Sequence, residues 1–403
     1  MMESPCAHSA MDNQSVERHY GFPLHLFQFF LILGLFCIAF VLCSQHFFPQ
    51  SREALIAPIT AIMSSLNDKE RQSQKTNRSV VILTWTSFFG SDLAVRFYMK
   101  GLAKCEYVCT ATSNRSELTA AAAVVFHIRN IDPSDLPQSR SPRQLFAFYL
   151  LESPYHSGSA LSRIRKDYFN ITMTYRLDSD VRAGYGWMRP IDKSTTPDEV
   201  WKWKEIETIA KGKTKSVLIL VSNCATRSKR EVYVRALAKH IEVTRFGLCS
   251  KAVCDKKCAE EAIAQHYFYL AFENSVCRDY VTEKVFSYME KIIVPIVLKR
   301  SFASSILPNG SFIAIDDFNS PASLAEHLKY LQSNKTEYMK YFEWAKKYRR
   351  NLSEDYACNL CRFLHKNSNA TRVIADIGRW WYGNEMCIDD YAERLLLQKE
   401  GSM

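Results

Sequence analysis

One glutamate in the sequence has the surroundings of a general base. Glu152 follows the apolar run Leu145–Leu151 and opens the stretch Glu-Ser-Pro-Tyr-His. A carboxylate at the end of a buried strand can be partly desolvated, which raises its pKa toward the range of a base that works near neutral pH. An ordinary glutamate at the end of a strand has the same sequence context, so these residues alone leave both interpretations open.

Two basic clusters occupy positions where an anion such as a diphosphate could bind. The stretch from Asn274 to Lys284 follows an apolar run that ends at Phe272, and it leads into a helical pattern. A strand-to-helix turn of this kind offers free backbone N–H groups and the positive end of a helix dipole. The basic residues from Arg227 to Arg230 follow a second apolar run in the same way. Solvated charges on surface helices are the alternative for each cluster, but together the clusters favour a phosphate site at the carboxyl ends of parallel strands.

Short apolar runs alternate with polar helical patterns along the body of the chain. The first series of expected strands comprises Val80–Trp85, Ala122–Ile128, Gln144–Leu151 and Phe169–Tyr175. The second series comprises strands at Ser216–Val221, Ile241–Phe246, Tyr267–Phe272, Ile292–Leu298 and Ser311–Ile315, with helices at Lys229–His240, Cys258–His266, near Thr282–Lys291, and from Ser320-Pro321 onward. This alternation is typical of doubly wound parallel sheets. The sequence therefore predicts an α/β protein with two Rossmann-like domains facing a cleft.

The segment before the first strand has the pattern of a single transmembrane helix and a stem. Residues 22–43 form the one long apolar run, which is long enough for a helix to cross the hydrocarbon of a bilayer. No convincing cleavage site follows, which favours a signal anchor over a cleaved signal peptide. We therefore expect residues 1–21 to be a cytosolic tail and residues 44–79 to be a stem.

Sequons and cysteines after this run indicate a body in the lumen of the secretory pathway. Ten of the 13 cysteines lie there, an even number that suits an oxidising compartment. Candidate N-glycosylation sites are Asn77, Asn114, Asn170, Asn309, Asn334, Asn351 and Asn369. The net charge of +10 favours an anionic partner without selecting one. No block of Lys and Arg is dense enough to predict a nucleic-acid partner.

A set of longer motifs runs through the body of the chain, from about Val80 to Cys361. The motifs are Glu152-Ser-Pro-x-His, Tyr168-Phe-Asn-Ile-Thr-Met-Thr-Tyr-Arg-x-Asp-Ser-Asp180, Tyr185-Gly, Val221-Ser-Asn, Phe272-Glu-Asn-Ser, Asp279-Tyr-Val-Thr-Glu-Lys284, Val294-Pro-Ile-Val-Leu, Asp316-Asp-Phe, Ser320-Pro and Cys358-x-x-Cys361. In type and order they resemble the α1,3-fucosyltransferases of glycosyltransferase family 10. The extra cysteines look more like those of invertebrate and plant members, including members that act on the N-glycan core.

The resemblance implies a GT-B enzyme that moves L-fucose from GDP-β-L-fucose to the 3-hydroxyl of a GlcNAc residue, with inversion. The acceptor would be either an N-glycan core or a Lewis- or LacdiNAc-type terminus. Glu152 matches the family's base, and Arg230 and Lys284 match its phosphate-binding cations. Positions that match the surroundings of the nucleotide and fucose are Ser222, Asn223, Tyr185, Tyr269, Asn274, Tyr280 and Glu283.

The same resemblance implies a division of the chain and a set of covalent links. Residues 80–195 would face the acceptor, 196–213 would form a linker, 214–355 would bind GDP-fucose, and 356–403 would return to the first domain. Disulfide bonds are implied between the early pair Cys105 and Cys109 and the late pair Cys358 and Cys361, with zinc binding as the competing interpretation. Pairing stays open for Cys224, Cys249, Cys254, Cys258, Cys277 and Cys387.

An Asp-x-Asp triplet invites a different interpretation of the chemistry. Asp178 and Asp180 could hold a divalent cation against a diphosphate, as in GT-A transferases. They lie far in sequence from the basic clusters, however, so we expect no cofactor to be required, with stimulation by Mn²⁺ or Mg²⁺ left open. The rival functions are a metal-dependent GT-A-type Golgi transferase and a glycan-binding ectodomain without turnover. The expected location is the Golgi membrane, as a single-pass type II protein with a lumenal body.

Overall fold

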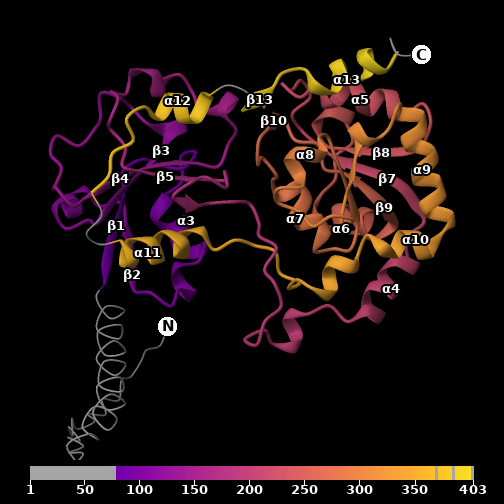
Figure 1. Cartoon of the computed structure of the whole chain (residues 1–403), viewed down its shortest axis with the longest axis horizontal. Coiled ribbons are helices and arrows are strands. Elements are labelled where there is room, and N and C mark those ends of the chain that lie inside the picture. Colours follow the sequence, from indigo (N-terminus) through magenta and orange to yellow (C-terminus); the bar gives the residue numbers. More distant parts are fainter. Residues whose placement is uncertain (1–78, 368–370, 384–385, 401–403) are drawn as a thin grey trace, which may run out of the picture. The chain divides into compact units, whose positions relative to one another are not determined.

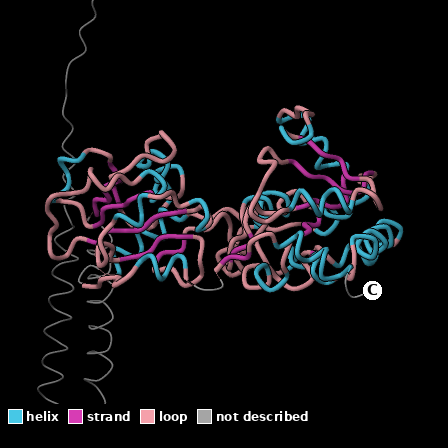
Figure 2. The backbone as a smooth tube through the Cα atoms, turned by 90° about the horizontal axis from the view of Figure 1, so that it is seen from above, coloured by secondary structure: helices cyan, strands magenta, loops and turns pink. Residues whose placement is uncertain are grey.

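The computed structural model describes residues 79–367, 371–383 and 386–400. These residues form two parallel sheets, each surrounded by helices (Figures 1 and 2). The expected α/β class with two parallel-sheet domains is therefore correct. The apolar run of residues 22–43, the stem up to residue 78, and the sequon asparagines Asn77 and Asn369 lie outside the described residues. Within the described part of the chain, no helix has the length and apolar character needed to cross a membrane.

The first sheet has six parallel strands in the order β2-β1-β3-β4-β5-β6. Its two central strands are buried at every position, as parallel strands covered by helices on both faces must be. The strands are β1 (Val80–Thr84), β2 (Cys109–Thr112), β3 (Ala123–His127), β4 (Leu145–Leu150), β5 (Ile171–Thr174) and β6 (Val181–Arg182). Helix α3 (Leu93–Met99) also belongs to this half.

The second sheet has five parallel strands in the order β12-β11-β9-β7-β8. The strands are β7 (Lys215–Leu220), β8 (Val243–Phe246), β9 (His266–Leu270), β11 (Val294–Val297) and β12 (Ile313–Ala314). The helices around it are α4 (Trp203–Lys211), α5 (Arg230–Leu237), α6 (Lys256–Gln265), α7 (Glu283–Met289), α8 (Arg300–Ala303), α9 (Pro321–Ser333) and α10 (Lys335–Lys340). Ser320 caps α9 and Pro321 starts it, as the sequence predicted.

The order of the strands reverses once in each sheet, and this places the candidate site. In the second sheet, β7 lies between β8 and β9. The chain therefore runs from β7 to β8 on one side and then crosses back to β9 on the other side. In open α/β sheets, ligands bind in the crevice outside the carboxyl ends of the strands at such a point. The residues that follow β7 and β9 include Ser222, Asn223 and Asn274.

The structure adds detail to two segments of the expected domain division. Residues 196–213 are not a plain linker, because they contain α4, whose Ile206 and Ala210 are buried in the second core. The last segment returns to the first half only in part: α11 (Tyr356–Lys366) and α12 (Ile377–Tyr382) pack there, with Trp381 fully buried. Beyond them, β13 (Cys387–Ile388) pairs with β10 (Val276–Cys277), and α13 (Tyr391–Glu400) packs against α5 (Figure 1).

Disulfide bonds fasten the C-terminal segment to both halves. Cys105 is bonded to Cys358, and Cys109 to Cys361, which joins the early cysteine pair to the late one. The remaining bonds among the described residues are Cys224–Cys249, Cys254–Cys258 and Cys277–Cys387. The cysteines that a zinc site would have needed are thus consumed in disulfides.

One of the expected glycosylation sites does not fit the folded chain. Asn170 is 3% exposed, its Oδ1 accepts from the N–H of Phe146, and its Nδ2 donates to the carbonyl oxygen of Arg372. A glycan on this nitrogen would have to displace that contact and open the core, so the folded chain disfavours Asn170 as a glycosylation site. Asn114, Asn309 and Asn351 are exposed, and Asn334 is partly exposed as the cap of α10.

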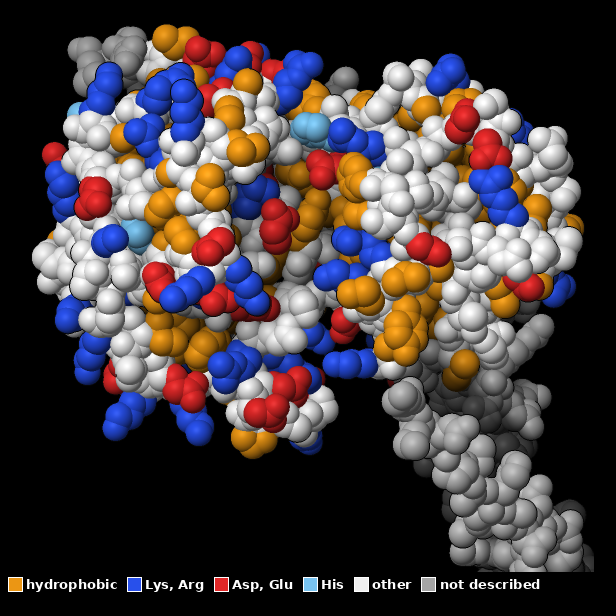
Figure 3. All heavy atoms as spheres, turned by 180° about the vertical axis from the view of Figure 1, so that it is seen from behind, with side chains coloured by type: hydrophobic (Ala, Val, Ile, Leu, Met, Phe, Trp, Pro, Cys, Tyr) orange, Lys and Arg blue, Asp and Glu red, His pale blue; other side chains and the backbone are white. Residues whose placement is uncertain are grey.

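Charges of both signs are mixed over the surface. On the face in Figure 3, Lys and Arg side chains alternate with Asp and Glu, without one broad basic area. The surplus of basic residues is therefore dispersed on this face. A local arrangement of cations, rather than a general positive field, must select an anionic ligand there.

Candidate active site

The first candidate phosphate-binding residue is a buried cation at the reversal point of the second sheet. Arg230 is the first residue of α5 and is 3% exposed. Its Nη1 donates to the carbonyl oxygen of Phe272 at 2.6 Å, and its Nη2 donates to that of Asn223 at 3.0 Å. Burial lowers the pKa of the guanidinium, although nearby acidic groups oppose this. Two carbonyls aim this cation without neutralising it, which suits an anionic ligand.

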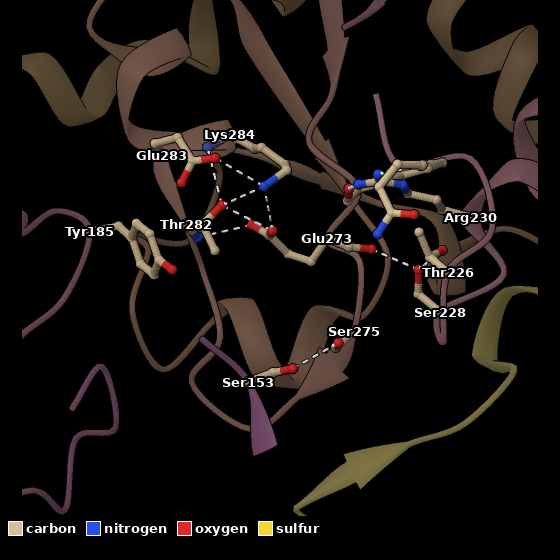
Figure 4. Close-up of polar contacts among 12 residues, drawn as sticks. Ser153, Tyr185, Thr226, Ser228, Arg230, Glu273, Ser275, Thr282, Glu283 and Lys284 are labelled. Carbon is tan, nitrogen blue, oxygen red and sulfur yellow. Dashed lines mark hydrogen bonds and ion pairs between the residues drawn. The ribbon is translucent and has the colours of Figure 1, made fainter. Parts of the chain in front are cut away.

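The second cation, Lys284, lies at the start of α7 among acidic groups (Figure 4). Its Nζ lies 3.1 Å from Oε2 of Glu273 and 3.0 Å from Oε1 of Glu283. Burial opposes its charge, but the two carboxylates outweigh burial and raise the pKa of Lys284. The ammonium is therefore firmly protonated and held in place. Glu283 is exposed, so its carboxylate has free surface for a sugar hydroxyl.

Glu273 organises this corner, although the sequence argument gave it no role. Its carboxylate accepts from the N–H and the hydroxyl of Thr282, both at 2.9 Å, and from Lys284. Thr282 is the N-cap of α7, and its hydroxyl also accepts from the backbone N–H of Lys284. Burial raises the pKa of Glu273, with Lys284 opposing the shift. Glu273 therefore fixes the start of α7 and the position of Lys284 together.

Asn274 faces the same region and has an unsatisfied oxygen. Its Oδ1 is buried and has no hydrogen-bond partner among the described residues. Its backbone is fixed, because Ser228 donates through its N–H to the carbonyl of Asn274 and through its hydroxyl to that of Glu273. A buried polar atom without a partner in a native fold calls for a ligand or water to satisfy it.

The other candidates around the nucleotide differ in how they reach the site. Ser222 and Asn223 are exposed on the loop after β7. Tyr269 is a core residue, 1% exposed, stacked on Tyr288 with ring centroids 3.5 Å apart, and only its hydroxyl reaches the carbonyl of Leu220. The sequence pattern did not reveal that this ring lies so deep.

Two tyrosines connect the halves of the molecule. Tyr185, from the first half, donates its hydroxyl to the carbonyl of Leu151 at 2.9 Å and meets Tyr280 edge-on at 6.2 Å between ring centroids. Tyr280 is 5% exposed and belongs to the second half. Burial, with smaller effects from Tyr185 and Glu152, raises the pKa of Tyr280 well above its usual range. Burial also raises the pKa of Tyr185 well above its usual range, so both phenols stay protonated and can donate hydrogen bonds.

Glu152 sits where the two halves meet. Its side chain is 27% exposed, and its Oε2 lies 4.0 Å from Nδ1 of His156. The next residue, Ser153, donates its hydroxyl to that of Ser275 at 2.8 Å, and both serines are buried (Figure 4). Because Ser275 directly follows Asn274, this contact ties the loop of Glu152 to the loop that carries the unsatisfied amide. The candidate base and the candidate donor site are thus brought together.

Comparison with known proteins identifies the family of the chain. The description "Fucosyltransferase, N-terminal" matches residues 77–186, and "Glycosyltransferase family 10 (fucosyltransferase) C-term" matches residues 210–380. The chain is 34% identical over 344 residues to α-(1,3)-fucosyltransferase C of Drosophila melanogaster, covering 78% of this chain and 80% of the relative. It is 31% identical to the 4-galactosyl-N-acetylglucosaminide 3-α-L-fucosyltransferase 9 of Rattus norvegicus, covering 88% and 97%. The chain belongs to glycosyltransferase family 10, the α1,3-fucosyltransferases.

The fold of this fucosyltransferase family member also has a solved counterpart. A crystal structure of an α1,3-fucosyltransferase with GDP-fucose superposes with a TM-score of 0.51 at 18% identity, covering 74% of this chain and 93% of that chain. At this identity the likeness concerns the fold alone, and it supports the GT-B architecture expected from the sequence. The family resemblance drawn from the motifs is therefore confirmed.

The Asp-x-Asp triplet of this family member is engaged elsewhere. Asp178 is paired with Nε and Nη2 of Arg176. Asp180 accepts from the N–H and hydroxyl of Thr172 and pairs with Arg372. The two carboxylates thus pair with different arginines instead of sharing one bound cation. This arrangement removes the basis for the GT-A interpretation.

A strap of residues 386–392 braces both candidate phosphate loops. The N–H of Asp390 donates to the carbonyl of Arg227, and that of Ala392 to the carbonyl of Ser228. On the other side, Cys387 is bonded to Cys277 and pairs with it in the short β10–β13 ladder. Nothing in the spacing of the sequence predicted this contact, because the strap and the loops lie more than a hundred residues apart.

Proposed function

We propose that this chain transfers L-fucose from GDP-β-L-fucose to the 3-hydroxyl of a GlcNAc residue in a glycan, with inversion at the fucose anomeric carbon. The observation that carries the proposal is that two oriented cations, Arg230 and Lys284, both lie near Glu273, and that the loop of Glu152 is joined to the same segment through Ser153 and Ser275. The activities in the names of the relatives support it.

In the proposed reaction, Glu152 takes the proton from the acceptor hydroxyl. The freed oxygen forms a bond to the anomeric carbon as the bond from that carbon to the β-phosphate oxygen breaks. One displacement of this kind inverts the configuration. Arg230 and Lys284 would bind the departing diphosphate, where negative charge develops and fixed cations contribute most. Glu283, Asn274 and the hydroxyls of Tyr185 and Tyr280 would orient the nucleotide and fucose.

We infer that no metal ion is needed for this step. The diphosphate has two cations of the chain itself, whereas Asp178 and Asp180 are neutralised by Arg176 and Arg372. Stimulation by weakly bound Mn²⁺ or Mg²⁺ would then act outside the chemical step. We also propose a Golgi location, with the apolar run of residues 22–43 as a type II anchor.

For the acceptor, only the reacting sugar, a GlcNAc residue, is proposed. The rat relative is named for galactosylated N-acetylglucosaminide, which favours a Lewis-type terminus. The additional cysteines Cys249, Cys254, Cys258 and Cys277 look more like those of invertebrate and plant members, which include members that act on the N-glycan core. Both classes offer a GlcNAc 3-hydroxyl, so a panel of glycans must contain each.

The experiment is a transfer assay on the full-length chain in detergent. GDP-fucose is supplied with an N-glycan core, lactosamine and LacdiNAc glycans, with and without EDTA. We expect fucose on one class of glycan, in a linkage that an α1,3-specific fucosidase removes, and activity that survives EDTA. Loss of all activity in EDTA would contradict the metal-free mechanism. A folded protein that transfers fucose to none of these glycans would contradict the proposed acceptor sugar.

A further inference from the structure

A second concave surface lies away from the candidate active site, on the flank of the first half. This groove has a volume of about 740 Å³, within the usual range of ligand pockets. Its walls come from β6, from the segment around Trp187, and from α11. None of the residues proposed to bind GDP-fucose lines it.

The lining suits a neutral, polyhydroxylated ligand. Five basic and four acidic side chains nearly balance, which disfavours a strongly charged partner. Trp187 is 39% exposed, and the guanidinium of Arg182 stacks on its ring at 4.0 Å. An exposed indole offers an apolar face for the C–H groups of a sugar ring.

Arginine donors beside this indole lack partners. Nε and Nη1 of Arg182 and Nε of Arg189 are buried without a hydrogen-bond acceptor among the described residues. The Nε of Arg182 lies 3.8 Å from Oε2 of Glu354, which is too far for a hydrogen bond. Small movements of these side chains would turn the donors toward oxygen atoms of a ligand in the groove, and these new hydrogen bonds would offset the cost of burying unpaired donors.

A sequon stands at the rim of this groove. Asn351-Leu-Ser353 is exposed at its asparagine, and Ser353 lines the groove. The Oδ1 of Asn351 accepts from the N–H of Ser353 at 2.9 Å and from its hydroxyl at 2.6 Å, so the amide is folded onto a residue of the wall. The N–H of Trp187 donates to the carbonyl of Leu352 at 2.8 Å, so the indole-bearing residue lies beside the sequon.

From this placement we propose that the groove beside Trp187 binds the N-glycan carried by Asn351, with a GlcNAc ring of its core against the indole. The tether holds the glycan at high effective concentration, so weak contacts are enough to seat it. The five disulfides among the described residues are typical of a secretory protein, in which sequons can be glycosylated. The inference does not depend on fucosyl transfer.

A seated glycan would also brace the chain between the two halves. Residues 187–191 and 347–353 run antiparallel beside each other, with bonds from Arg349 N–H to the Arg189 carbonyl and from Ile191 N–H to the Lys347 carbonyl. Gly186, next to Trp187, has so little space that a Cβ there would meet the ring of Phe286 in α7. A glycan on this ribbon would therefore stiffen a segment that adjoins both halves.

The test compares glycan release at three sites of the full-length chain produced in insect cells. Glycopeptide mass spectrometry gives occupancy, and native-state treatment with peptide N-glycosidase gives the rate of release at Asn351, Asn114 and Asn309. We expect Asn351 to be occupied and released at least tenfold more slowly than the other two. Trp187→Ala should bring the rate at Asn351 to that of the controls, whereas Tyr382→Ala, which removes an exposed aromatic ring outside the groove, should not.

Two results would overturn the proposal. One is an unoccupied Asn351; the other is release at Asn351 as fast as at Asn114 and Asn309 in the unmodified chain, a comparison that needs no folded variant. A second readout uses Asn351→Gln, which should bind added chitobiose, detected by quenching of tryptophan fluorescence, only while Trp187 is present. Binding that persists in the Trp187→Ala, Asn351→Gln double variant would place the sugar elsewhere.

Discussion

Replacing Arg230 by Met should depress fucose transfer far more than it destabilises the fold. Arg230 donates to the carbonyls of Phe272 and Asn223 at 2.6 and 3.0 Å, and it is 3% exposed. Removing it leaves two buried carbonyls without this donor, at a cost of about 1–3 kcal/mol each. Burial lowers the pKa of Arg230, however, so deleting the cation also removes a desolvation cost. The two effects oppose each other.

The net loss of stability should therefore be about 1–2 kcal/mol, which for a folding unit of about 150–250 residues lowers Tm by roughly 2–8 °C. The effect on transfer has no such compensation. Loss of one preorganised group that stabilises developing charge costs about 10²–10³ in kcat, or roughly 3–4 kcal/mol. Arg230→Lys keeps a charge but cannot reach both carbonyls, so its kcat should lie between those of the unmodified chain and Arg230→Met.

The assay measures kcat with GDP-fucose in excess, together with Tm from a thermal-shift scan. Arg235→Met is the matched control, because Arg235 lies on the same helix and is exposed. The control should change kcat by less than twofold. The reasoning is refuted if Arg230→Met unfolds the protein, or lowers Tm by more than about 10 °C, while its folded fraction keeps normal kcat.

Three further changes test other parts of the structure. Burial raises the pKa of Glu354 from 4.5 to about 7, so between these pH values the folded state holds a proton that the unfolded state has lost, and the free energy of unfolding falls as pH rises. Glu354→Gln lacks this loss of about 3 kcal/mol, so its Tm relative to that of the unmodified chain should rise from pH 4.5 to pH 8. A Tm difference that does not depend on pH would count against the raised pKa. Ser153→Ala and Ser275→Ala should each lower kcat without raising the KM for GDP-fucose, and the double variant should be no worse than either single one, whereas additive effects would mean that the two hydroxyls act separately. Replacing Cys277 and Cys387 together by serine opens a loop of 110 residues and should cost about 2–4 kcal/mol, with a higher KM for GDP-fucose; an unchanged KM would show that the strap serves stability alone.

The sheets could be predicted because their central strands are buried on both faces. Apolar runs such as Leu145–Leu150 stand out from any helical pattern, and their boundaries were predicted to within a residue or two. The edge strand β2 was not predicted, because its sequence Cys-Thr-Ala-Thr is short, polar and only half buried. Helix α4 was also missed, since its lysines and glutamates look like a linker and only Ile206 and Ala210 contact the core.

The candidate site residues were proposed from the sequence, but the contacts among them could not be. Local sequence shows that Lys284 starts a helix, yet it does not show that buried Glu273 holds it. The pairing of Ser153 with Ser275 joins residues 122 positions apart, so it depends on how the halves meet. Asn170 shows the limit of a motif taken by itself: its sequence is a valid sequon, but tertiary packing buries the side chain. The motif gives no sign of this burial.

The central claim is that Glu152 acts as the base for transfer to a glycan hydroxyl. The most direct measurement is fucose transfer by Glu152→Gln, with GDP affinity measured on the same protein by calorimetry. We expect transfer to fall by about 10²–10⁴, the usual contribution of a positioned base, while the Kd for GDP stays within twofold. A variant that transfers fucose at the normal rate would show that another group removes the proton.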